Sequence, residues 1–132
     1  MTVPQISLEE AWETLSEDPD AVLIDVRTLA EWSFVGIPDL TTIGKNVRTV
    51  EWTQFPTGQS NPDFLAQATE GLSPEQTLLM LCRSGGRSNA AAELLTAQGY
   101  NAVNVGSGFE GDLDPQGHRR GGWKDELPWR QS

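Results

Sequence analysis

The 132-residue sequence contains one cysteine, Cys82, and one histidine, His118. A single cysteine cannot form an internal disulfide, and one cysteine with one histidine provides too few ligands for a Cys/His zinc site. Considered alone, an isolated cysteine is most often a small buried apolar side chain. The sequence therefore predicts no disulfide and no metal, and any special chemistry of Cys82 must follow from its neighbours.

Basic residues and long apolar runs are also scarce. Nine lysines and arginines are outnumbered by 19 aspartates and glutamates, which gives a formal net charge of −10. Such an acidic surface repels nucleic acid and anionic lipid, so we expect neither nucleic acid nor a membrane as a partner. No apolar run is long enough to cross a bilayer, and residues 1–5 lack the basic and apolar regions of a signal peptide. We therefore expect a cytoplasmic protein.

The length and composition fit one compact domain. A chain of 132 residues can bury a single core, and 37% hydrophobic and 21% charged residues are ordinary globular values. We predict one domain over residues 1–132, with its core at about 6–111 and an irregular tail, 112–132, packed on that core. Trp123 and Trp129 are the expected anchors of the tail, because large aromatic side chains bury the most surface.

Helix and strand patterns alternate along the chain. Helices are predicted at 8–15, 29–32, 62–70 and 88–98, and strands at 21–26, 46–52, 77–81 and 101–105. Ser7 and Glu10 fit a capping box at the start of the first helix. This alternation predicts an α/β fold with three layers, a mostly parallel sheet with helices on both faces. Sites in such sheets form beyond the carboxyl ends of strands, which is where Cys82 lies.

The loop after Cys82 has the composition of an anion-binding turn. Gly85 and Gly86 allow backbone N–H groups to turn inward, and the start of a helix adds a partial positive charge. Both effects would stabilise a thiolate, and Arg83 and Arg87 add permanent positive charge. Two glycines after a strand often form nothing more than a tight turn. A cysteine at a strand end followed by two glycines, two arginines and a helix start, however, favours a nucleophilic cysteine.

Three segments of the sequence resemble the rhodanese family. Residues 79–88, LMLCRSGGRS, resemble its active-site strand and loop, and residues 23–38 resemble its strand, acidic-aromatic helix and turn. Residues 104–111, NVGSGFEG, resemble the glycine-rich segment after its last strand. The family histidine before Ile37 is missing, and Asp39-Leu40 replaces its usual Gly-Ala. The resemblance implies a rhodanese-like domain.

The resemblance also implies a reaction and its participants. Cys82 would attack the outer sulfur of a small anionic donor such as thiosulfate, release sulfite and keep a persulfide. A thiol or cyanide, or an acceptor protein, would then remove that sulfur, without any cofactor. The residues implied to bind the substrate are Arg83, Ser84, Gly85, Gly86, Arg87 and Ser88.

Four other polar residues are given a structural role. Asp25, Arg27 and Glu31 could be imagined as acid, base or ligand groups, but we expect Arg27 to pair with a carboxylate and hold the adjacent helix on the sheet. His118 lies in the tail, so we expect a solvated or structural histidine and not a Cys–His pair.

Two other functions remain open. Cysteine-loop phosphatases and arsenate reductases place five residues between the cysteine and the arginine, whereas four residues separate Cys82 from Arg87. The shorter loop fits one sulfur atom better than a tetrahedral oxyanion. The second alternative is a sulfur-carrier or protein-interaction module without catalysis. Retention of the cysteine weighs against it.

Overall fold

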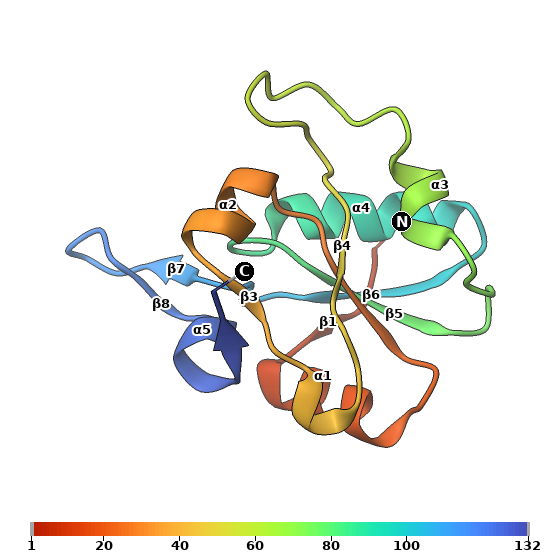
Figure 1. Cartoon of the computed structure of the whole chain (residues 1–132), viewed down its shortest axis with the longest axis horizontal. Helices are drawn as coiled ribbons and strands as arrows, with labels where there is room; N and C mark the ends of the chain where they lie inside the picture. Colours follow the sequence, from red (N-terminus) through yellow and green to blue (C-terminus); the bar gives the residue numbers. More distant parts are fainter. Residues whose placement is uncertain (1, 132) are drawn as a thin grey trace.

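A computed structural model describes residues 2–131 and confirms the three-layer α/β architecture. All pairings in the central five-stranded sheet are parallel, in the order β1-β6-β5-β2-β4. Helices α3 and α4 cover one face, and α1 covers the other (Figure 1). The strands are β1 (Gln5–Ile6), β2 (Val22–Asp25), β3 (Ile37–Pro38), β4 (Arg48–Thr49), β5 (Thr77–Leu81), β6 (Asn101–Val105), β7 (Gly111–Leu113), β8 (Arg119–Gly121) and β9 (Trp129–Arg130). The helices are α1 (Leu8–Glu17), α2 (Leu29–Phe34), the 3-10 turn η1 (Thr41–Ile43), α3 (Phe64–Thr69), α4 (Gly86–Ala97) and α5 (Trp123–Glu126).

The central strand β5 contributes to two separate cores because its side chains alternate between the faces of the sheet. Leu79 and Leu81 pack into the core on the α1 side. Leu78, Met80 and Cys82 belong to the core beneath α3 and α4. The strand period thus directs Cys82 to the face on which α4 begins.

Two capping boxes fix the helices that follow β1 and β2. Ser7 Oγ accepts the backbone N–H of Glu10, whose carboxylate in turn accepts the N–H of Ser7, as the sequence predicts. Thr28 and Glu31 form the same reciprocal pair at the start of α2. Glu31 is thereby held at a defined place on the first turn of α2.

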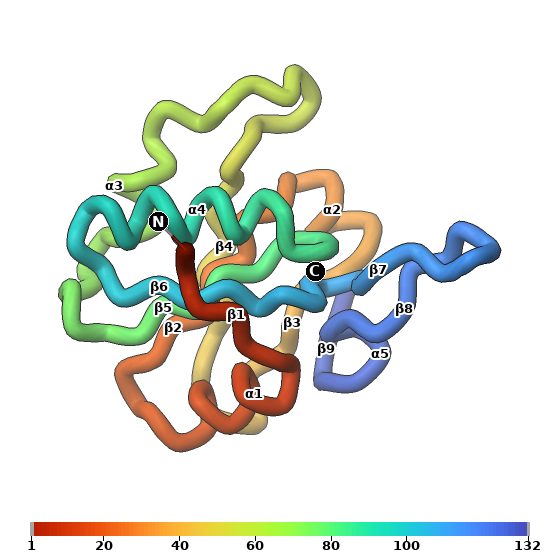
Figure 2. The backbone as a smooth tube through the Cα atoms, turned by 180° about the vertical axis from the view of Figure 1, so that it is seen from behind, coloured from red at the N-terminus to blue at the C-terminus, as the bar shows by residue number. Residues whose placement is uncertain are grey.

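The C-terminal tail is more regular than expected. Strands β7 and β8 form an antiparallel hairpin that projects from the body of the molecule (Figure 2). Helix α5 follows, and β9 pairs antiparallel with β3. Trp123 is fully buried and Trp129 is partly buried, so both anchor the tail. The expectation of an irregular tail is wrong, because its short strands obtain their hydrogen bonds from each other and from the 37–38 segment.

Other boundaries also differ from the predicted ones, and α1 and α2 each extend two residues further, to Glu17 and Phe34. The strand expected at 46–52 is reduced to β4, although the backbone N–H groups of Val50 and Trp52 still donate to the carbonyls of Asp25, the last residue of β2, and Val26. Helix α3 begins only at Phe64, because Asn61 first closes a turn by accepting the N–H of Asp63. Helix α4 begins two residues earlier than predicted, at Gly86. Within the described residues, no helix has the length and apolarity needed to cross a membrane.

Candidate functional site

Cys82 lies immediately after β5, with 1% of its surface exposed. The backbone N–H of Gly85 donates to its Sγ at 3.1 Å, and Ser88 Oγ lies 3.3 Å from the same sulfur. Ser88 is in the first turn of α4. The sulfur therefore faces the partly positive start of a twelve-residue helix, as the order of strand, loop and helix predicts.

The loop after Cys82 is held from outside by the segment that follows β6. The backbone N–H of Phe109 donates to the Cys82 carbonyl at 2.7 Å, and that of Glu110 donates to the Arg83 carbonyl at 3.0 Å. Gly108 has a φ of +72°, and a Cβ there would collide with the Arg83 carbonyl. The glycine-rich segment noted in the sequence thus positions the cysteine loop by direct backbone contact.

Gly85 has the backbone conformation that turns the chain into α4. Its φ is +106°, and an added Cβ would lie 2.5 Å from the Gly106 carbonyl oxygen. Gly86 is different, because its φ is ordinary and an added Cβ would have no neighbour within 4 Å. These neighbouring glycines provide a matched pair for testing the shape of the loop.

We predict that Gly85→Ala impairs the site while Gly86→Ala does not. The first substitution combines a disfavoured φ with a backbone collision, at a cost of about 1–3 kcal/mol. The second removes only flexibility of the unfolded chain and leaves stability unchanged or raised by about 0.4–1 kcal/mol. Urea unfolding measures the change in stability of each variant, and the rate of iodoacetamide reaction at Cys82 measures the change in the site. Equal behaviour of the two variants would contradict this assignment.

Asn104 completes the surroundings of the sulfur and was not anticipated. Its side chain accepts from Ser88 Oγ at 2.6 Å and donates to the Gly85 carbonyl at 3.1 Å. Because the Ser88 hydroxyl has one proton and Asn104 is its nearest acceptor, the Gly85 N–H is the principal donor to Sγ among the described residues. The sequence signals for Asn104 are a polar residue between two valines of β6 and its place at the start of the 104–111 segment.

Asp25 and Arg27 form an ion pair whose side chains are fully buried. The Arg27 guanidinium donates to the carboxylate at 2.7 Å and to the Gly36 carbonyl at 2.8 Å, and it lies 4.1 Å from the centre of the Phe109 ring. This contact links β2 to the turn before β3 and to the segment after β6. The expected pairing of Arg27 with a carboxylate is confirmed.

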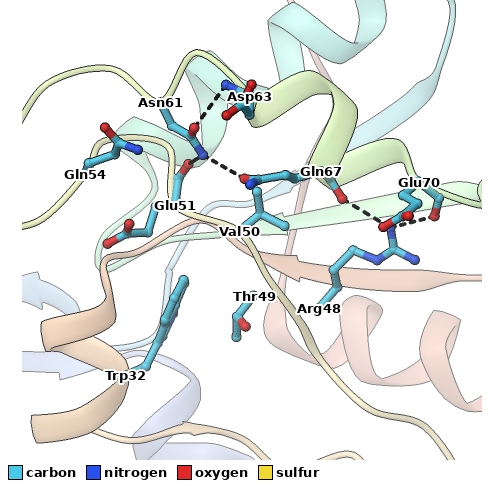
Figure 3. A pocket seen from close by; sticks show the side chains of 10 residues that line it. All are labelled: Trp32, Arg48, Thr49, Val50, Glu51, Gln54, Asn61, Asp63, Gln67 and Glu70. Carbon is cyan, nitrogen blue, oxygen red and sulfur yellow. Dashed lines mark hydrogen bonds between the residues drawn. The ribbon is translucent and has the colours of Figure 1, made fainter.

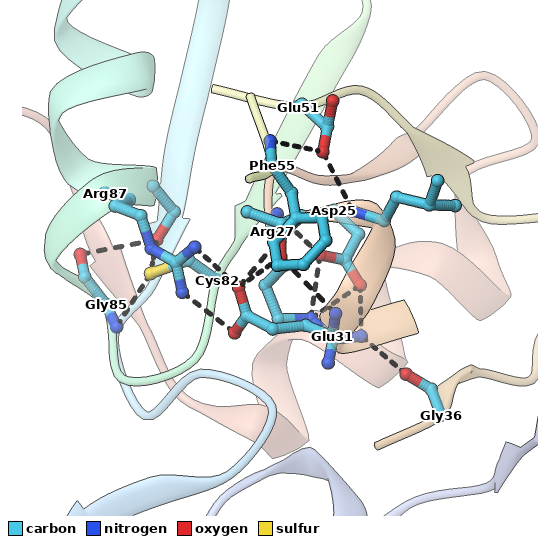
Figure 4. A network of polar contacts seen from close by, with 12 residues as sticks. Asp25, Arg27, Glu31, Gly36, Glu51, Phe55, Cys82, Gly85 and Arg87 are labelled. Atoms are coloured by element: carbon cyan, nitrogen blue, oxygen red, sulfur yellow. Dashed lines mark hydrogen bonds and ion pairs between the residues drawn. The ribbon is translucent and has the colours of Figure 1, made fainter. Parts of the chain in front are cut away.

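Glu31 connects α2 with the cysteine loop, as Figure 4 shows. Its two carboxylate oxygens accept from the two terminal nitrogens of Arg87 at 2.7 and 3.0 Å. Burial favours a higher pKa for Glu31, but the hydrogen bonds and charge of Arg87 outweigh it and hold the pKa below its ordinary value. The hydrogen bond with Glu31 likewise raises the pKa of Arg87. The sequence predicted both residues near the site but not their contact.

The remaining candidate residues lie in different surroundings. Arg83 is exposed, and its side chain has no hydrogen bond or ion pair within residues 2–131. Ser84 is half-buried beside it. His118 is exposed in the β7–β8 hairpin, where its backbone N–H donates to Asp114, and it is not among the residues that contact Cys82. The structure thus offers no support for a Cys–His pair.

A hollow of about 430 Å³ lies away from the cysteine loop, between β4 and the segment that leads into α3 (Figure 3). Arg48 at one end donates to backbone carbonyls of α3, and Asn61 bridges the Glu51 carbonyl and the Gln67 side chain. Cys82 does not line this hollow. The described residues also contain no cluster of three potential His, Cys, Asp or Glu metal ligands.

Comparison with known proteins finds similar structures and a similar sequence that extend over nearly the whole chain. A crystal structure of Rv0390 from M. tuberculosis is 47% identical, with a TM-score of 0.90 and complete coverage of both chains. The solution structure of the polysulfide-sulfur transferase homodimer from Wolinella succinogenes is 25% identical, with a TM-score of 0.66, covering 97% of this chain and 78% of that one. A thylakoid rhodanese-like protein from Oryza sativa subsp. indica is 34% identical over 94% of this chain, which spans 24% of that protein.

The model of one family, described as the STR4 middle domain, matches residues 4–132. This range contains the cysteine loop, the Asp25–Arg27 pair and the regular C-terminal tail. The chain therefore belongs to the STR4 middle domain family of rhodanese-like domains, whose relatives include sulfurtransferases.

Proposed function

We propose that this protein is a sulfurtransferase that carries sulfur as a persulfide on Cys82. The Cys82 thiolate attacks the outer sulfur of thiosulfate, the S–S bond of the donor breaks, and sulfite leaves with the bonding electron pair. A cyanide ion or a thiolate then attacks the terminal sulfur of the persulfide. This second step forms thiocyanate or a new persulfide and regenerates the Cys82 thiolate.

The observation that carries this proposal is the position of the only cysteine. Cys82 accepts the Gly85 N–H at 3.1 Å in front of the first turn of α4, where negative charge on sulfur is stabilised. A terminal persulfide sulfur would extend from Sγ along the same loop. The relationship to the polysulfide-sulfur transferase from Wolinella succinogenes supports sulfur as the transferred atom.

The loop residues receive separate roles in this proposal. The backbone N–H groups of Arg83 to Ser88 would hold the terminal sulfur, with Gly85 already directed at Sγ. Arg83 is exposed and would contribute attraction for a donor. Arg87 would stay beside the bound sulfur in its ion pair with Glu31 and contribute its backbone N–H group. We further propose that the chain works as one domain in the cytoplasm, where a reducing environment keeps Cys82 available as a thiol.

A transfer assay tests the proposal against the other candidate chemistries. With thiosulfate and either cyanide or a thiol, we expect sulfite release in proportion to acceptor consumed. Phosphate monoesters and arsenate should give no turnover, because four residues between Cys82 and Arg87 form a loop too short for a tetrahedral oxyanion. Turnover of a phosphate monoester without sulfur transfer would favour the phosphatase alternative. Inactivity with every sulfur donor would favour an interaction module.

A further inference from the structure

We propose that Glu31 sets the charge selectivity of the Cys82 site by withholding Arg87 from small anionic sulfur donors. The inference deepens the proposed sulfurtransferase function, on which it rests for its biological meaning. It assigns Glu31 a role in specificity, beyond the structural role expected from the sequence. It also names the favoured donor class, a persulfide on an organic thiol, in preference to a dianion such as thiosulfate.

Glu31 occupies the edge of the Arg87 guanidinium, formed by its two terminal nitrogens, to which an anionic donor would otherwise bind. Both terminal nitrogens of Arg87 donate to Glu31, at 2.7 and 3.0 Å, in the parallel geometry that makes arginine–carboxylate pairs strong. The side chains of Arg87 and Glu31 retain only 28% and 20% of their surface exposure. An incoming oxyanion would therefore have to displace a bound carboxylate.

Glu31 is also fixed in place by its own helix. It is the capping-box residue of α2, accepting the Thr28 backbone N–H at 3.2 Å while its own N–H donates to Thr28 Oγ1. Turning away from Arg87 would break this cap as well. The carboxylate thus behaves as a built-in occupant of the arginine and not as a mobile surface group.

The charge of Arg87 would otherwise act directly on the cysteine. Arg87 precedes Ser88, which contacts Sγ, and electrostatic attraction to Cys82 contributes to the raised pKa of Arg87. Arg27 is neutralised by Asp25 in the same network. The Asp25–Arg27 and Glu31–Arg87 pairs therefore each have a net charge of zero. Arg83, which is exposed, is the arginine of the loop that has no ion-pair partner among residues 2–131.

A near-neutral site disfavours a dianion more than an uncharged donor. Thiosulfate carries two negative charges, whereas an organic persulfide in its protonated form, R–S–S–H, carries none. The Cys82 thiolate would attack the outer sulfur of R–S–S–H, the S–S bond would break, and the thiolate R–S⁻ would leave. The proton stays on the transferred sulfur, so atoms and charge balance without any further reagent.

The test compares two alkylating reagents of similar size that differ in charge, iodoacetate and iodoacetamide. Both react with the thiolate of the only cysteine, so the ratio of their rates reports local charge and cancels changes in thiolate fraction or access. Glu31→Gln keeps a residue suited to the capping box but removes the negative charge. We expect it to raise the iodoacetate-to-iodoacetamide ratio about three- to tenfold. Arg87→Gln should lower the ratio, because it leaves Glu31 uncompensated.

Glu51→Gln is the matched control. Glu51 also supports the start of α2, accepting the Leu29 backbone N–H at 2.9 Å, and the substitution changes the net charge equally without freeing Arg87. Its ratio should stay within about twofold of wild type, because Glu51 is half-buried, its charge is partly screened, and it has no hydrogen bond or ion pair with Arg87 among residues 2–131. A general disturbance of the fold would shift Glu31→Gln and Arg87→Gln in the same direction. That result, or an unchanged ratio in Glu31→Gln, would overturn the inference.

Sulfur transfer gives a second reading that separates the two proposals. In Glu31→Gln we expect the KM for thiosulfate to fall by a similar or larger factor, with little change for an uncharged persulfide donor. If the alkylation ratio shifts as expected but no variant transfers sulfur, the charge selectivity stands and the sulfurtransferase proposal fails. If sulfur is transferred but neither the ratio nor the KM responds to Glu31, only this inference fails.

Discussion

Replacing Cys82 by serine should abolish sulfur transfer, lowering turnover by at least about a thousandfold. The reason is chemical, because an oxygen at this position cannot become a persulfide and the chain has no other cysteine to replace it. Continuous measurement of sulfite release from thiosulfate, with cyanide as acceptor, gives the turnover directly.

The same substitution should leave the fold in place. A serine Oγ can accept the Gly85 N–H that Sγ accepts at 3.1 Å, so the free energy of unfolding should change by no more than about 1–2 kcal/mol. Cys82→Ala provides a second variant without a hydroxyl. Turnover near the wild-type value in either folded variant would show that Cys82 does not carry the sulfur.

The largest effect on stability is expected for Asp25→Asn. Arg27 and Asp25 are both fully buried, so the substitution leaves a buried guanidinium without its counter-charge. Breaking such a pair from one side costs about 3–5 kcal/mol, a large part of the stability of an ordinary domain. Urea or thermal unfolding measures this loss, and hydrogen exchange at β2 and at residues 36–38 should locate it.

Two further variants show whether burial is the cause. Asp114→Asn removes a carboxylate from the pair with Arg120, whose side chain is 70% exposed, and an asparagine oxygen can still accept the Gln116 and His118 N–H groups, so the unfolding midpoint should stay close to that of wild type. Replacing Asp25 and Arg27 together by apolar residues should cost less than Asp25→Asn alone, because no charge is left buried. Equal losses at Asp25 and Asp114 would contradict the importance assigned to the buried pair.

Local sequence signals were sufficient for most of the core and for the cysteine loop. The buried strand before Cys82, the capping box at Ser7 and the alternation of helices with strands all depend on neighbours within a few residues. The α/β fold and the place of Cys82 at a strand end could therefore be predicted. The pairing of Arg27 with a carboxylate was also predicted, and the full burial of both side chains now gives its physical reason, because a lone buried charge is costly.

Contacts between distant segments could not be predicted in this way. Glu31 and Arg87 are 56 residues apart, and only the arrangement of α2 against the cysteine loop brings them together. Asn104 reaches Ser88 because β6 lies beside β5 in the sheet. The regular tail was missed for the same reason, since β9 consists of two residues that depend on β3 for their hydrogen bonds.

The intact mass of the protein after exposure to a sulfur donor tests the central claim most directly. Wild-type protein treated with thiosulfate, or with an organic persulfide, should gain the mass of one sulfur atom and lose it again when cyanide is added. Cys82→Ser should gain nothing under the same conditions. Absence of any added sulfur with both donors, or the same addition in Cys82→Ser, would contradict the assignment of Cys82 as the sulfur carrier.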